Sequence, residues 1–252
     1  MIASQYIKST TDKPKQYKDY EAINVLKWNN SKWKTLCPYY LKTDGNETNK
    51  NDGNIIFENF YQGCKVYDKV YDIKVYPSKY QTNDPKYLWW EFVPIIDTGD
   101  ILVDENNNIN YNTYNRWKNS LWNCKHPIRY PNKFSNKTNV KFSLCIDTNG
   151  VIETRMNYLQ SRKEIYVKEY VRLIKNIKEY NILLDKLKNN QNIMICEVDV
   201  PAKHKKGEYN NCDNDNICEL TIDILEKMLN DTSEAFGHGL CLAYALLLDL
   251  KQ

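Results

Sequence analysis

The segment near the end of the chain, residues 236–250, places the strongest constraint on the fold. Its central part, 240–248, reads LCLAYALLL and carries no charged residue. A helix that is apolar all round has to be covered on every side. The sequence therefore predicts a central, buried helix over 236–250, around which the rest of the 252-residue chain is arranged.

Hydrophobic periodicity and turn signals predict the other elements. Helices are expected at 55–71, 111–123, 157–189 and 221–229, the last capped by Thr221. Strands are expected within 72–103 and at 193–200, and a hairpin joins 141–147 to 151–152 through Asn149-Gly150. Irregular segments are expected at 1–20 (a polar lead-in), 42–54, 104–110, 124–139 and 202–217. The sequence thus predicts an α+β, mainly helical single domain over 1–252 with small sheet and hairpin elements.

Charge and apolar runs restrict the partners. The net charge of +3 neither requires a nucleic acid nor excludes one. The basic cluster 203–206 fits either a solvated loop or a phosphate-binding loop. The polar start of the chain lacks the apolar core of a signal peptide, and no apolar run reaches the roughly 18 residues that a membrane span needs. We therefore expect a cytoplasmic protein without membrane contact.

The eight cysteines are scattered and mostly lie in apolar surroundings, as expected for free buried thiols. Cys212 and Cys218 could bind a metal together with His204, but their spacing fits no common zinc site. The sequence therefore predicts neither a metal nor another cofactor.

The segment 57–65, FENFYQGCK, carries the chemistry that stands out most. On a helix, Glu58, Gln62 and Lys65 fall on one stripe, at i, i+4 and i+7. The neighbouring face is apolar and is made by Phe57, Phe60, Tyr61 and Cys64. Two interpretations remain open: a solvated helix face with weak side-chain pairing, or the polar lining of a pocket with aromatic walls.

The run E-N-F-Y-Q-G-C-K, residues 58–65, resembles the motif of the NADAR (YbiA-like) superfamily: an acidic residue, two aromatics, Gln, a small residue, a spacer and Lys. The stretch before it, from Trp28 to Phe57, is similar to the family's N-terminal segment. Residues 236–250 are similar to its closing Gly-rich turn and helix. There, Phe-Gly-His-Gly stands in place of the family's Trp-Gly and Asn-x-Leu-Gly elements. Residues 72–220 form a middle region that diverges from the family.

This resemblance implies a NADAR-like fold and an N-glycosidase that acts on an ADP-ribose-like or ribosylated-base substrate. Breaking an N-glycosidic bond builds positive charge on the ribose C1, which a carboxylate can stabilise. Glu58 is the candidate for that role, and Lys65 for a Schiff-base nucleophile or a proton donor to the leaving base. Gln62 is expected to bind sugar hydroxyls or the base edge, and Tyr61 belongs to the aromatic wall.

Further candidates for substrate binding lie elsewhere in the chain. Trp89 or Trp90 could stack a base, although core packing is the competing interpretation. Arg129 could clamp a phosphate or a carboxylate, and Asp199 could bind a ribose diol or cap a strand end. The segment Gly237-His238-Gly239 fits either a phosphate site at a helix N-terminus or a helix start that needs backbone freedom.

Two alternative functions stay open at this point. One is a non-catalytic module that binds ADP-ribose or a similar nucleotide. The other is a nucleic-acid-directed enzyme that removes ADP-ribose from DNA or RNA. The expected partner is a small-molecule nucleotide or an ADP-ribosylated base, with nucleic acid possible, and the sequence does not give the oligomeric state.

Overall fold

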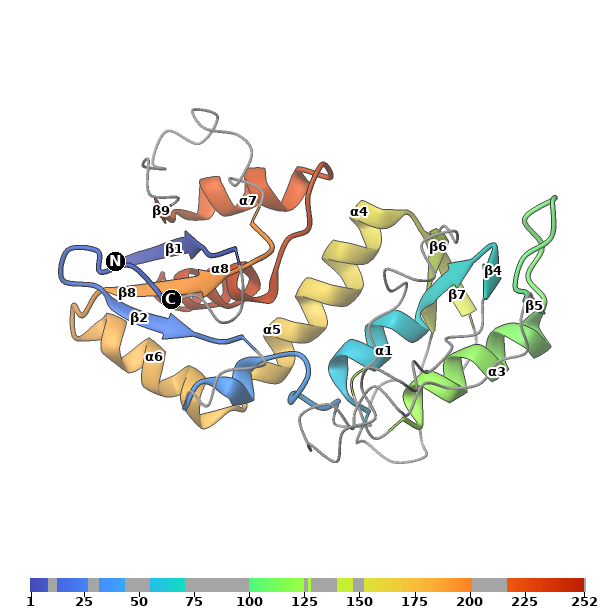
Figure 1. Cartoon of the computed structure of the whole chain (residues 1–252), viewed down its shortest axis with the longest axis horizontal. Helices are drawn as coiled ribbons and strands as arrows, with labels where there is room; N and C mark the ends of the chain where they lie inside the picture. The colour runs from blue at the N-terminus through green and yellow to red at the C-terminus, as the bar shows by residue number, and fades with distance from the viewer. Residues whose placement is uncertain are drawn as a thin grey trace, which may run out of the picture. The chain divides into compact units, whose positions relative to one another are not determined.

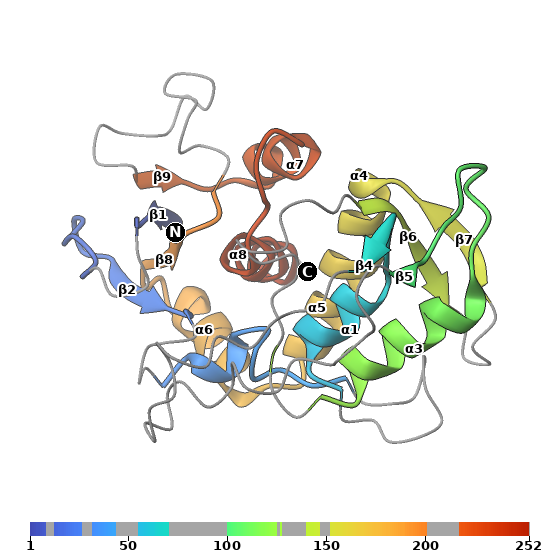
Figure 2. The ribbon, with the colours of Figure 1, turned by 45° about the vertical axis from the view of Figure 1, so that its right-hand side comes forward.

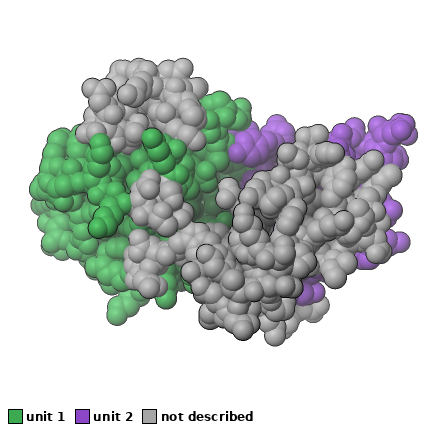
Figure 3. Space-filling model, viewed as in Figure 1, with its two compact units in different colours: residues 1–41, 162–252 green, residues 42–161 purple. Residues whose placement is uncertain are grey.

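The computed structural model describes residues 1–8, 13–26, 32–43, 55–70, 100–124, 127, 140–146, 152–200 and 217–251. The chain divides into two compact units, residues 1–41 with 162–252 and residues 42–161 (Figure 3). Both contain helices and small sheets, so the mixed α and β class is confirmed. The expectation of one domain stays a prediction, since two compact units can belong to one domain.

The first unit is built on a four-stranded sheet with the order β2-β8-β1-β9 (Figure 1). Its strands are β1 (Ile2–Tyr6), β2 (Glu21–Asn24), β8 (Ile193–Glu197) and β9 (Ile217–Glu219). Strands β1 and β2 run parallel to β8, whereas β9 runs antiparallel to β1. Because β8 lies between two parallel partners, all its residues are buried, as the apolar run 193–196 predicts.

The first unit also contains the helices η1 (Lys34–Leu36), α5 (Lys168–Ile174), α6 (Lys178–Lys188), α7 (Ile222–Asn230) and α8 (His238–Asp249). Helix α8 packs against β8 and β1 and also contacts α5, α6 and α7 (Figure 2). Its residues Leu240 to Ala243 are fully buried, which confirms the predicted central helix. The Thr221 hydroxyl accepts a hydrogen bond from the Ile224 N–H at 3.2 Å, which confirms the predicted cap of α7.

The predicted polar lead-in is wrong, because the chain begins with the buried strand β1. Ile2 and Ala3 are 2% and 0% exposed, and Ser4 and Gln5 are equally buried. The Gln5 side chain accepts a hydrogen bond from the Lys15 N–H at 3.1 Å. A strand covered on both faces shows no alternation of apolar and polar residues, so this short segment looked polar rather than extended.

The single helix predicted over 157–189 is also wrong, because the chain is interrupted there. Helix α4 (Tyr158–Ser161) continues as the π-helical η3 (Arg162–Val167) and then as α5, and α6 follows after a turn. Ile177 has an extended backbone, with φ −91° and ψ 130°, directly before α6. Apolar residues keep a helical spacing across this turn, so the periodicity did not reveal it.

The second unit, residues 42–161, contains a three-stranded antiparallel sheet with the order β3-β6-β7. Its elements are α1 (Phe57–Gly63), β3 (Lys65–Tyr67), β4 (Lys69–Val70), β5 (Asp100–Ile101), α3 (Tyr111–Trp122), β6 (Val140–Ile146), β7 (Ile152–Met156) and α4. The hairpin of β6 and β7 and the helix α3 confirm two predictions. The Asp104 side chain accepts hydrogen bonds from the N–H groups of Asn106 and Asn108, which confirms the predicted turn.

The helix predicted over 55–71 ends at Gly63, so its second half is wrong. Lys65 to Tyr67 form β3 instead, and Val66 pairs with Phe142 of β6. β-branched and aromatic residues such as Val66 and Tyr67 favour this pairing. Of the strands predicted within 72–103, only β5 falls in a described stretch.

Candidate functional site

Glu58, Gln62 and Lys65 converge in the second unit, although they do not share one helix. Glu58 and Gln62 lie one turn apart on α1, and the Gln62 Nε2 donates a hydrogen bond to the Glu58 Oε1 at 2.8 Å. Lys65 is the first residue of β3. Its Nζ nevertheless donates to the Gln62 Oε1 at 3.0 Å. The turn after Gly63 therefore brings the amine back to the amide, and one amide links the carboxylate to the amine.

Aromatic side chains border this group. The Lys65 Nζ lies 4.4 Å from the centre of the Tyr61 ring. The Tyr67 hydroxyl donates to the Gln62 Oε1 at 3.4 Å. Tyr61, Gln62 and Tyr67 are buried, whereas Glu58 and Lys65 are half-buried. Glu58 and Lys65 are thus the more exposed members of the group.

The surroundings of Lys65 disfavour its charged form. Burial lowers the pKa of the Lys65 amine below its ordinary value of 10.5, while the charges of Glu58 and Cys64 partly oppose the shift. Burial also raises the pKa of Tyr61, against a hydrogen bond with Ser161 that lowers it. Tyr61 is therefore a neutral phenol at ordinary pH, and Lys65 gains a larger share of neutral, nucleophilic amine than an exposed lysine.

Helix α3 fixes the position of α1. The Tyr114 hydroxyl donates to the Gly63 carbonyl at 2.9 Å, and the Trp122 Nε1 donates to the Phe60 carbonyl at 3.3 Å. A Cβ atom on Gly63 would collide with the Trp122 ring, so glycine permits this close approach. Next to it, the Leu144 N–H of β6 donates to the Cys64 carbonyl at 2.8 Å. The end of α1 is thereby held between a helix and a strand.

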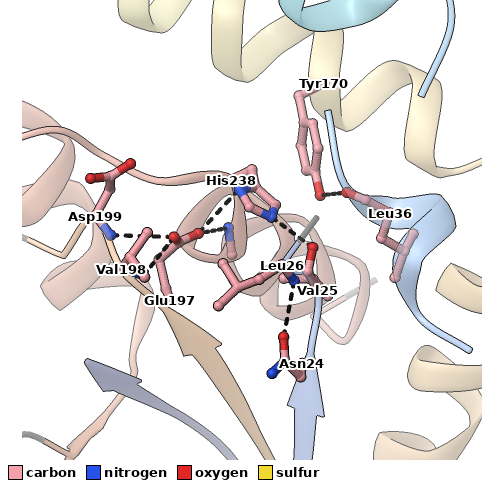
Figure 4. A network of polar contacts seen from close by, with 10 residues as sticks. Asn24, Val25, Leu26, Leu36, Tyr170, Glu197, Val198, Asp199 and His238 are labelled. Atoms are coloured by element: carbon pink, nitrogen blue, oxygen red, sulfur yellow. Dashed lines mark hydrogen bonds and ion pairs between the residues drawn. The ribbon is translucent and has the colours of Figure 1, made fainter. Parts of the chain in front are cut away.

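A second polar group lies in the first unit, around Glu197 at the end of β8 (Figure 4). Glu197 is fully buried. Its Oε1 accepts hydrogen bonds from the N–H groups of Val198 and Asp199 at 2.7 and 3.2 Å. Its Oε2 accepts from the Gly239 N–H at 2.7 Å and lies 3.2 Å from the His238 Nδ1.

His238 extends this network to β2. Its Nε2 lies 3.1 Å from the carbonyl oxygen of Val25, just after β2, so each ring nitrogen faces an acceptor (Figure 4). Tyr170 of α5 presents its ring to His238 at a centroid distance of 6.3 Å and donates its hydroxyl to the Leu36 carbonyl at 2.6 Å. The network thus joins the ends of two parallel strands to the start of α8.

The segment Gly237-His238-Gly239 does start a helix, as expected. The Gly239 N–H, which the sequence suggests for phosphate binding, already donates to Glu197, and the Gly237 N–H donates to the Asp199 carbonyl at 2.9 Å. The protein's own carboxylate therefore lies where an anion would bind at this helix N-terminus. The Asp199 side chain is exposed and points away from Glu197 (Figure 4).

Sequence reasoning missed Glu197. The one available signal is an acidic residue that ends the apolar run 193–196. A carboxylate there is buried with the strand and needs several donors. Three of the partners are backbone N–H groups, which no side-chain motif encodes, and the fourth is the His238 ring.

The remaining candidates lie outside the described residues: Trp89, Trp90, Arg129, the basic cluster 203–206 with His204, and Cys212. Cys218 is buried in β9. Among the residues that the structure describes, no three His, Cys, Asp or Glu side chains are grouped so that they could hold a metal ion.

The described helices include none with the length and apolar character that crossing a bilayer requires. Comparisons with protein-family models, with curated proteins and with solved structures gave no match to this chain.

Proposed function

We propose that the protein is an N-glycosidase of the NADAR (YbiA-like) kind that cleaves the N-glycosidic bond of an ADP-ribose-like or ribosylated-base substrate. The observation that supports it is the hydrogen-bonded series from Glu58 through Gln62 to Lys65. The Glu58 carboxylate and the Lys65 amine both hydrogen-bond to the Gln62 amide, and the pKa of the amine is lowered. A titratable group whose pKa is shifted by burial and that lies near a specific charged partner is typical of active sites.

Glu58 suits the carboxylate role because part of it remains available. Its Oε1 accepts from Gln62, and its Oε2 has no hydrogen-bond partner among the described residues. The half-buried carboxylate can therefore face the ribose C1. There it would stabilise the positive charge of the transition state or take a proton from the attacking water.

Lys65 suits either of two roles. As a neutral amine it adds to C1 of the ring-opened sugar, the base leaves with a proton, and water then hydrolyses the resulting imine and releases the amine. As an ammonium it protonates the leaving base. The lowered pKa of Lys65 favours the first role, because more of the amine is then unprotonated at neutral pH.

The test is to incubate the protein with ADP-ribosylated guanosine and, separately, with ADP-ribosylated DNA, and to measure the release of ADP-ribose by chromatography. We expect Glu58→Gln and Lys65→Ala each to lower turnover by about 100-fold or more. The exposed residues Glu105 and Lys141 of the same unit provide matched controls, and Glu105→Gln and Lys141→Ala should leave the rate unchanged.

Turnover that survives both site substitutions would refute this site. Binding of ADP-ribose without any release from either substrate would instead identify a binding module. Release from DNA alone, with a steep dependence on salt, would identify nucleic acid as the target. The cytoplasmic location expected from the sequence belongs to the same proposal.

A further inference from the structure

We propose that Gln62 is a positioning residue whose neutral amide separates the Glu58 carboxylate from the Lys65 amine and so keeps that amine available as a nucleophile. The use of the amine in catalysis rests on the function proposed above. The separation itself is a property of the side chains, and it can be measured without any substrate.

The hydrogen bonds fix the direction of the Gln62 amide. Its Oε1 accepts from the Lys65 Nζ at 3.0 Å and from the Tyr67 hydroxyl at 3.4 Å, which uses both lone pairs of that oxygen. Its Nε2 donates to Glu58 at 2.8 Å. The reversed amide would turn its oxygen toward the Glu58 carboxylate, and two acceptor oxygens repel each other. Gln62 therefore has little hydrogen-bonding capacity left for sugar hydroxyls. We assign it the role of positioning Glu58 and Lys65 rather than that of binding substrate.

This arrangement limits how far the Glu58 carboxylate can oppose the effect of burial on Lys65. A carboxylate in direct contact would hold the amine as an ammonium ion, which has no lone pair to attack carbon. Among the described residues, Glu58 is joined to Lys65 only through the Gln62 amide. Cys64 and the Tyr61 ring also lie near the amine, Tyr67 donates to the same Gln62 oxygen, and Ser143 lies opposite Lys65 on β6 and carries no charge.

Tyr67 supports the separation from the same strand as Lys65. Its side chain is fully buried, and its ring packs edge-on against Trp117 at a centroid distance of 5.8 Å. The hydroxyl is thereby held in place as the second donor to the Gln62 oxygen. Tyr67→Phe removes that donor without changing charge, and we expect a smaller effect than from a charged substitution at residue 62.

The experiment measures the reactivity of Lys65 toward a small aldehyde. The folded protein is treated with formaldehyde and cyanoborohydride across a pH series from about 6 to about 10, around the range in which lysines titrate, and methylation is quantified by mass spectrometry. Exposed Lys141 serves as the internal reference. In the wild type we expect Lys65 to react at lower pH than Lys141.

Gln62→Glu keeps the shape of the side chain and brings a carboxylate into contact with the amine. We expect the pH midpoint of Lys65 labelling to rise by about one unit or more, and labelling at neutral pH to fall about tenfold. Gln62→Met, which is neutral, should keep the midpoint low. The double variant Glu58→Gln, Gln62→Glu leaves the total charge of the site unchanged and moves the carboxylate next to Lys65, so it should behave as Gln62→Glu does.

The proposal is overturned if Gln62→Glu, or the double variant where the single one does not fold, leaves the Lys65 profile unchanged. It is also overturned if Gln62→Met raises the midpoint as much as Gln62→Glu does, because charge would then not be the cause. If the labelling results are as expected but the protein releases no ADP-ribose from any substrate, the glycosidase proposal is refuted and the separation of Glu58 from Lys65 by Gln62 is supported.

Discussion

Two glutamates of this protein show how differently a carboxylate can be held. Glu197 in the first unit is fully buried and receives three backbone N–H donors as well as the His238 ring. Glu58 in the second unit is half-buried and receives one hydrogen bond, from the side chain of Gln62. A carboxylate whose acceptors are all used holds structure together, whereas one with a spare oxygen at the surface can meet a ligand. The comparison assigns stability to Glu197 and chemistry to Glu58.

The sharpest way to break this comparison is to remove each carboxylate. We expect Glu197→Ala to lower the free energy of unfolding by about 3–5 kcal/mol, because it leaves three backbone N–H donors, of which that of Gly239 is buried, and the His238 ring without their acceptor. Glu58→Ala should cost less than about 1 kcal/mol, as for other partly exposed polar groups. Urea denaturation of the two variants measures both losses in the free energy of unfolding. Equal losses would contradict the assignment of stability to Glu197 and chemistry to Glu58.

A smaller effect is expected from Gly237→Ala, next to the Glu197 network. A Cβ atom there would lie 2.5 Å from the Glu197 Cδ and 2.8 Å from the Asp199 carbonyl oxygen. The backbone φ of −68° suits any residue, so the cost is steric alone. We expect a loss of about 1–3 kcal/mol by thermal or chemical denaturation. The Lys65 labelling profile should stay as in the wild type, and a changed profile would contradict the separate roles of the two groups.

The smallest expected effect is the contribution of Lys65, in the second unit, to the pH dependence of the free energy of unfolding. The unfolded chain keeps the Lys65 proton up to about pH 10.5, while the folded protein releases it at lower pH. Between those two values unfolding takes up a proton, so the stability of the wild type rises with pH. Lys65→Met lacks this group and should be more stable than the wild type at neutral pH, with an advantage that shrinks toward pH 10.5. Denaturation midpoints at neutral and alkaline pH test this, and a constant difference would contradict it.

Local signals predicted the elements whose cause is local. The apolar run of α8, the Thr221 cap of α7 and the amphipathic helix α3 are each encoded within a few residues. Strand β1 was missed because its stability comes from partners about 190 and 215 residues away, at Ile193–Glu197 and Ile217–Glu219.

In the candidate site, too, the features encoded locally were predicted and those that depend on distant residues were not. Helical spacing predicted that Glu58, Gln62 and Lys65 come together, and they do. The amine, however, arrives from β3 after α1 has ended, which the spacing did not indicate. The end of α1 depends on the approach of Gly63 to Trp122 and on the pairing of β3 with β6, and both partners are distant in sequence. The role of Glu197 could not be predicted from the sequence, because most of its hydrogen bonds come from backbone N–H groups.

The long sequence separation in the sheet of the first unit affects how the protein folds on the ribosome. Strand β1 leaves the exit tunnel well before β8 and β9, so it stays unpaired until Ile193–Glu197 and Ile217–Glu219 have been made. The second unit consists of one continuous stretch, Lys42–Ser161, and can form in the meantime. Slow translation between the two stretches would give the earlier stretch time to fold, and the exposed edge of β1 is the part that chaperones would have to shield.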